Sequence, residues 1–147
     1  MIYSGSGKKL FSKILVAIDG SESAKKAFAT SIYLASISKC RLDVIHVVSC
    51  EFGGDSAASL DLVEDLKIKA NSMLEEYKKV ALEKDIHPEF ILEIGDPSNM
   101  ITEIVNSKDY DLVVLGTRGM SQVKELFLGS VSMKVIHHAK CPVMVVR

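Results

Sequence analysis

Glycine and serine residues near the end of the chain have the types and the spacing that a phosphate-binding turn needs. The stretch LGTRGMSQVKELFLGSVS carries Gly116 and Gly119, and nine residues separate Gly119 from the pair Gly129-Ser130. Glycine lets main-chain N–H groups approach a ligand closely, and the first N–H groups of a helix attract an anion. Two turns of this kind could hold a polyphosphate between them.

These turns also have a simpler explanation. Glycine at a strand end and Gly-Ser before a helix are common in loops that bind nothing. The phosphate motifs G-x-x-x-x-G-K-[ST] and G-x-G-x-x-G do not occur in the sequence. The GSGKK segment at Gly5 has no strand before it and no hydroxyl residue after its lysines, so we expect residues 1–12 to be a mobile leader. On spacing alone, both interpretations stay open.

One acidic residue follows the first apolar run of the chain. Asp19, in ILVAIDGSES, can accept hydrogen bonds from ribose hydroxyls. Through a water molecule it could also hold a cation. Its position next to a predicted strand end makes it a candidate for the same site as the glycines.

Five short apolar runs predict the strands that would position these residues. They are rich in Val, Ile and Leu, and several are continuous rather than alternating, which is typical of a parallel sheet with both faces covered. The runs begin at Lys13, Leu42, Glu89, Asp111 and Pro142.

Helical patterns separate these runs. Apolar residues at three- and four-residue spacing predict four helices, at 21–38, 57–84, 97–105 and 130–138. Ser21 is a suitable N-cap for the first helix, and Pro97 suits the first turn of the third. Such alternation predicts one α/β domain, a single five-stranded parallel sheet with helices on both faces. Ligands of these sheets lie beyond the carboxyl ends of the strands, where the strand order reverses.

The bulk composition excludes several functions. A length of 147 residues suits one domain, and a net charge of −1 provides no basic surface for nucleic acid or anionic lipid. No apolar run approaches the roughly 20 residues that a membrane-spanning helix needs, and no signal-peptide pattern opens the chain. Cys40, Cys50 and Cys141 lack metal-ligand spacing and are typical of free thiols. We expect a cytoplasmic protein that binds neither nucleic acid nor membrane.

Three segments resemble the universal stress protein family: ILVAIDGSESAKKAF, VIHVV and LVVLGTRGMSQVKELFLGSVSMKVIHHAKCPVMVV. The likeness covers residues 13–147, which we expect to form a universal stress protein domain. The pattern G-x-x-G-x9-G-[ST] marks the ATP-binding branch of that family. Gly116, Gly119, Gly129 and Ser130 match it in full.

The resemblance implies an adenine-nucleotide alpha-hydrolase-like, Rossmann-like fold and a site for ATP with Mg²⁺. Asp19 would meet the ribose and, through water, the cation. Ala17 and Ile18 would lie on the adenine side, and Val47 would offer its backbone to the adenine. Arg118 could pair with phosphate oxygens through both arms of its guanidinium. The residues around the ribose and phosphates would be Gly116, Arg118, Gly119, Gly129, Ser130, Val131 and Ser132.

The family also commonly forms a homodimer through its last strand, which here would include Val143 to Val146. An exposed apolar strand at a sheet edge is normally covered or paired. The resemblance therefore implies a dimeric regulatory or stress-response protein, whose protein partner the sequence does not identify.

Efficient catalysis has little support in the sequence. ATP hydrolysis needs a positioned water or base as well as a metal, and Asp19 is the single acid that can be placed near the site. We expect slow hydrolysis at most and assign no catalytic residue.

Two alternatives of other classes remain. A nucleotidyl transferase or pyrophosphatase would use ATP, although the H-x-G-H and S-G-G-x-D-S patterns of such enzymes are missing. A dimeric interaction protein would bind no nucleotide. A phospho-receiver fits less well, because it needs paired acids after the first strand and only Asp19 is present there. A flavin-binding domain also fits less well, because the DGSESA loop after that strand is only weakly rich in Ser and Thr.

Overall fold

Strands and helices alternate along the chain in the computed structural model, which describes residues 10–49, 57–118 and 128–147. Each predicted element is present, and its ends agree with the prediction to within two residues. The predicted leader falls mainly on residues 1–9, outside the described residues, and stays a prediction. The elements are β1 Lys13–Ala17, α1 Glu22–Ser38, β2 Arg41–Val48, α2 Ala57–Glu83, β3 Glu89–Ile94, α3 Pro97–Ser107, β4 Leu112–Gly116, α4 Ser130–His138 and β5 Val143–Val146.

The five strands form one parallel sheet in the order β3-β2-β1-β4-β5. Ile14 of β1 is in register with Leu42 of β2 on one side and with Leu112 of β4 on the other. The chain therefore builds the sheet outward from β1 in one direction and then, from β4, in the other. The predicted fold class is confirmed, and the strand order reverses between β1 and β4.

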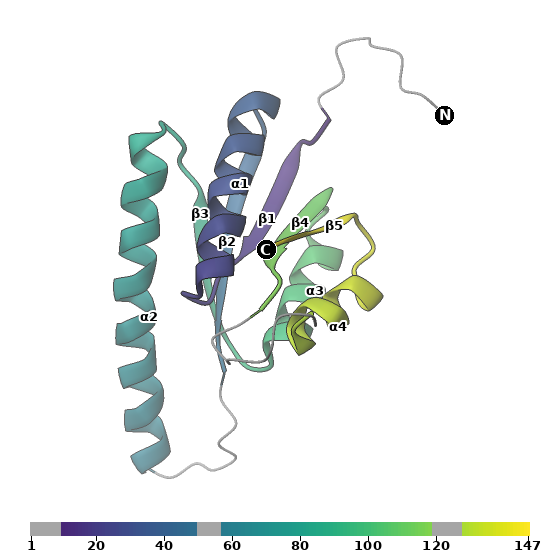
Figure 1. Cartoon of the computed structure of the whole chain (residues 1–147). Coiled ribbons are helices and arrows are strands. Elements are labelled where there is room, and N and C mark those ends of the chain that lie inside the picture. The colour runs from purple at the N-terminus through teal and green to yellow at the C-terminus, as the bar shows by residue number, and fades with distance from the viewer. Residues whose placement is uncertain (1–9, 50–56, 119–127) are drawn as a thin grey trace.

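Helices cover both faces of the sheet, α1 and α2 on one side and α3 and α4 on the other (Figure 1). Successive side chains of a strand point to opposite faces. Accordingly, Ile14 and Val16 of β1 pack in the cluster beneath α1 and α2, whereas Leu15 and Ala17 pack beneath α3 and α4. Both sets must be apolar, and this explains the continuous apolar runs in the sequence.

Side chains cap the starts of α1 and α3, as the sequence predicts for α1. The hydroxyl of Ser21 accepts a hydrogen bond from the N–H of Ala24 at 3.2 Å. Asp96 caps α3 by accepting from the N–H of Asn99 at 2.9 Å, with Pro97 in the first turn. Helix α4 differs because its N-cap is Gly129, which has no side chain to offer.

Helix α2 packs on the sheet mainly through its second half. Ala70, Leu74, Tyr77 and Ala81 are buried there, while Leu62, which lies in the predicted apolar stripe, is 38% exposed. The first turns of α2 extend past the ends of the strands (Figure 1), which explains this exposure.

Among the helices that the structure describes, none combines the length and the apolar composition that a membrane span requires.

A buried carboxylate joins the strands at the amino end of the sheet. Asp43 of β2 is 1% exposed and accepts hydrogen bonds from the Tyr110 hydroxyl at 2.7 Å and from Arg41 Nε at 2.9 Å. Arg41 also pairs with Glu89 of β3, and the ammonium of Lys13 of β1 lies over the ring of Tyr110. Burial and the bond to Asp43 raise the pKa of Tyr110, so its hydroxyl stays a donor.

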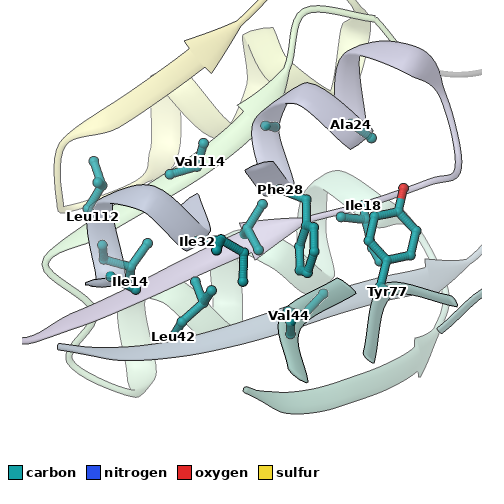
Figure 2. Packing of buried hydrophobic residues seen from close by; sticks show 14 of the residues in the cluster. Ile14, Ile18, Ala24, Phe28, Ile32, Leu42, Val44, Tyr77, Leu112 and Val114 are labelled. Atoms are coloured by element: carbon teal, nitrogen blue, oxygen red, sulfur yellow. The ribbon is translucent and has the colours of Figure 1, made fainter. Parts of the chain in front are cut away.

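Tyr77 brings an unused donor into the core. Its ring meets that of Phe28 edge-on, with centroids 4.8 Å apart, and lies near Ile18 (Figure 2). Its hydroxyl is buried and has no hydrogen-bond partner in the described part of the chain. Burial, together with the negative charge of Asp19, raises the pKa of Tyr77 to about 12. The hydroxyl is therefore protonated at neutral pH, and it costs free energy.

The Tyr77→Phe substitution should leave the free energy of unfolding unchanged or raise it by about 1 kcal/mol, because it removes the unpaired hydroxyl and keeps the ring. Urea denaturation measures this. Tyr77→Ala, which deletes the ring against Phe28, should lower the same quantity by roughly 3–5 kcal/mol. A clear loss of stability in the phenylalanine variant would show that the hydroxyl does have a partner.

Candidate functional site

A pocket of about 190 Å³ opens at the carboxyl end of the sheet, at the reversal between β1 and β4. This is the place where α/β sheets of this kind bind ligands. Residues from six elements and from the turns beside them line the pocket. They are Ala17, Ile18, Asp19, Ala24, Ile45, Val47, Pro97, Ile101, Leu115, Gly116, Arg118, Gly129, Ser130, Val131 and Ser132.

The floor of the pocket is apolar and consists of buried side chains. Ala17, Ile45 and Leu115 are buried on three neighbouring strands, and Ile101 of α3 packs in the same cluster. The N–H of Ile18 continues the sheet by donating to the carbonyl of Ile45 at 2.9 Å. The flat face of a nucleobase can lie against such a surface, because neither presents a hydrogen-bonding group to the other.

Asp19 is held at one side of this floor by a local turn. Its Oδ1 accepts from the N–H of Ser21 at 3.0 Å and from the Ser21 hydroxyl at 2.6 Å. Gly20, with φ +83, supplies the left-handed backbone that the turn requires. Before the turn, the carbonyl of Ile18 accepts from Nδ1 of His46 at 2.8 Å, which fixes the proton on that nitrogen. The second carboxylate oxygen, Oδ2, has no donor among the described residues.

The N-terminus of α4 lies at the other side of the pocket. Ser130, Val131 and Ser132 form its first turn, which contains no acidic residue. The N–H of Gly129 donates to the carbonyl of Thr117 at 2.7 Å, and Ser132 Oγ donates to the carbonyl of Gly116 at 2.8 Å. Helix N-termini carry partial positive charge and free N–H groups. This side of the pocket therefore favours an anion.

Gly116 is a glycine because helix α1 leaves no room for a side chain. A Cβ at this position would lie 2.4 Å from Ser23 Oγ, 2.8 Å from the Ser23 carbonyl carbon and 2.9 Å from the Ala24 nitrogen. The sequence suggested that the glycine admits a ligand. The structure adds a second reason, which is the close approach of the α1 N-terminus to the end of β4.

The structure brings almost all of the predicted site residues together. Ala17, Ile18, Asp19, Val47, Gly116, Arg118, Gly129, Ser130, Val131 and Ser132 all line the pocket. Gly119 lies outside the described residues, as does the segment 120–127 between the glycine turns. Ala24, Ile45, Pro97, Ile101 and Leu115 also line the pocket and were not predicted. Of these, Leu115 had a local signal, because it precedes Gly116 in the same strand.

The pocket contains little that could hold a metal by itself. Asp19 is the one carboxylate among the described residues that line it. Within the described ranges, no group of three or more His, Cys, Asp or Glu side chains is arranged for metal binding. A cation at this site would therefore need most of its ligands from a bound molecule and from water.

The parallel sheet, with a pocket at the point where its strand order reverses, is the architecture of the doubly wound α/β class of proteins. The sequence model of the universal stress protein family matches residues 10–147. The chain belongs to the universal stress protein family.

Relatives in sequence and in structure agree with this assignment. Universal stress protein YxiE of Bacillus subtilis is 33% identical over 148 residues, covering 94% of this chain and 100% of the relative. The solved structure of the hypothetical protein MJ0577 superposes with a TM-score of 0.85 at 27% identity, covering 93% of this chain and 96% of that one. A universal stress protein family protein of Arabidopsis thaliana, solved with AMP bound, has a TM-score of 0.69 at 25% identity, with coverage of 92% and 90%.

The Gly116→Ala substitution should lower the free energy of unfolding by roughly 1–3 kcal/mol, because two of the three atoms that a Cβ would meet belong to the α1 backbone. Chemical denaturation followed by circular dichroism measures the loss. Gly129→Ala is the matched variant, since Gly129 has φ −62, a value that alanine readily adopts. It should cost less, and equal losses would argue against the close contact at Gly116.

Proposed function

We propose that this chain is an ATP-binding universal stress protein that acts as a nucleotide-dependent regulatory module. The observation that carries the proposal is the pairing of two polar groups across one apolar floor. The Oδ2 atom of Asp19 stands on one side, and the uncapped N-terminus of α4 stands on the other. These are the acceptor that a ribose needs and the donors that phosphates need.

Each part of the nucleotide has a matching set of residues in this proposal. The adenine would lie against Ala17 and Ile18, with the backbone of Val47 beside it. The ribose hydroxyls would donate to Asp19. The phosphates would accept from the first N–H groups of α4, in Ser130, Val131 and Ser132. The glycines Gly116, Gly119 and Gly129 would let the turns on either side approach the phosphates closely. The exposed side chain of Arg118 would add positive charge at the same end.

The family relationship supports a nucleotide ligand. The Arabidopsis thaliana protein belongs to the same family as this chain, and its structure was solved with AMP bound. The preference for a triphosphate with Mg²⁺ over a monophosphate is our proposal. It rests on the glycine pattern and on the N-terminus of α4, which has no side-chain cap and no acidic residue in its first turn and therefore favours a larger negative charge.

Slow turnover follows from the same set of residues. Mg²⁺ would be held by the phosphates, by water and by Asp19, the one pocket carboxylate in the described part of the chain. Asp19 already accepts two hydrogen bonds from Ser21, so it is poorly placed to act as a base. We infer a protein that binds ATP, hydrolyses it slowly at most, and passes the nucleotide state on to a protein partner.

Isothermal titration of nucleotide-free protein should give tighter binding of Mg-ATP than of AMP, because ATP places more negative charge beside the N-terminus of α4. Asp19→Asn should raise the dissociation constants of both ligands about tenfold, since it removes the negative charge that strengthens hydrogen bonds from the ribose hydroxyls. The asparagine Oδ1 can still accept from Ser21, so the turn is kept.

The control for Asp19→Asn is Asp85→Asn. Asp85 is fully exposed in the loop before β3, at the opposite end of the sheet from the pocket. The Asp85→Asn substitution should leave the affinities for Mg-ATP and AMP unchanged. If wild-type protein binds neither nucleotide, the chain is an interaction protein that takes no nucleotide. Equal affinity for ATP and AMP would remove the role given to α4.

We further propose a homodimer formed through β5, which lies at one edge of the sheet. The carbonyls of Pro142 and Val146 point toward β4, where they accept from the N–H groups of Val113 and Thr117. The main-chain polar groups of successive residues in a strand point in alternate directions. The N–H and carbonyl groups of Val143 and Val145 therefore point away from β4, toward the open edge, where a second copy could pair with them.

Light scattering should give a particle of twice the 16.1 kDa chain mass for wild-type protein. Val145→Pro removes one outward N–H without touching the bonds to β4, so it should give a folded monomer. Val145→Ala keeps the N–H and should stay dimeric. Circular dichroism checks that each variant is folded. A folded proline variant that remains a dimer would place the interface elsewhere.

A further inference from the structure

Two serines at the N-terminus of α1 join the turn that carries Asp19 to the turn that follows β4. The carbonyl oxygen of Arg118 lies 2.7 Å from Ser23 Oγ and 3.2 Å from Ser21 Oγ. The N–H of Arg118 also points to Ser23 Oγ, at 3.4 Å. Both main-chain polar groups of Arg118 therefore face the side chain of Ser23.

Counting hydrogens separates the roles of the two serines. Each hydroxyl has one hydrogen to donate. The hydroxyl of Ser21 lies 2.6 Å from the carboxylate of Asp19, and this charge-assisted bond is stronger than a longer one to a neutral carbonyl. The oxygen of Ser21 also accepts from Ala24 as the helix cap. Ser21 thus serves Asp19, and the hydroxyl hydrogen of Ser23 is left for Arg118.

The turn after β4 is held from both faces of the sheet. On the α1 side, the missing side chain of Gly116 lets Ser23 come close enough to bond Arg118. On the α4 side, Ser132 donates to the carbonyl of Gly116 at 2.8 Å. Ser23 and Ser132 together set where this turn lies relative to the first N–H groups of α4.

We propose that Ser23 is a positioning residue for the phosphate end of the bound nucleotide, an inference that rests on the proposed function. Ser23 does not line the pocket. It acts through Arg118 and the turn at Gly116, which it holds opposite the α4 N-terminus so that both can bind the same phosphates. The apolar floor does not depend on Ser23, and Asp19 is held by Ser21.

The test compares a ligand that has phosphates with one that has none. Isothermal titration of Ser23→Ala should show a dissociation constant for Mg-ATP raised about tenfold, with that for adenosine changed by less than about twofold. Ser36→Ala is the matched control, because Ser36 also lies on α1 and its hydroxyl bonds within the helix, to the carbonyl of Tyr33. It should change neither constant.

A second substitution guards against a loss of folding. Ser23→Thr keeps the hydroxyl and should bind Mg-ATP within about twofold of the wild type. A purely structural role for Ser23 would weaken ATP and adenosine in parallel, and that result would overturn the inference. So would an unchanged affinity for ATP in Ser23→Ala when the wild type prefers ATP to adenosine. A wild type without that preference would overturn the proposed function, and this inference with it.

Discussion

The close contact between α1 and Gly116 is the constraint on which the pocket depends. Backbone atoms of Ser23 and Ala24 occupy the space that any larger residue at position 116 would need. Because α1 comes this near, its first turn bonds both to the Asp19 turn and to Arg118. The carboxyl ends of β1 and β4 are thereby tied together, although they belong to distant parts of the chain.

The pocket itself arises from the directions in which the chain leaves these two strands. After β1 the chain passes into α1 on one face of the sheet, and α4, the next described helix after β4, lies on the opposite face (Figure 1). The two segments diverge and leave a crevice between them. Its floor is apolar because the strands are covered on both faces, and its two sides are polar because turns and helix ends must expose main-chain groups there.

The elements were predictable because their signals are local. Apolar runs, the Ser21 cap and Pro97 set the ends of strands and helices within a few residues. The pocket residues that belong to a sequence motif, such as Asp19 and Gly116, were predictable for the same reason. Ile101 was not, because it reaches the pocket only through the packing of α3 on the sheet. The bond from Ser23 to Arg118 spans 95 residues, so no local pattern could indicate it.

The buried Asp43 lies at the end of the sheet remote from the pocket, together with Tyr110 and Arg41. The buried contacts of Asp43 and the turns that line the pocket are thus separated along the length of the same strands. A change in a turn at the carboxyl end does not touch the Asp43 contacts at the amino end. One architecture can therefore carry turns that recognise different molecules.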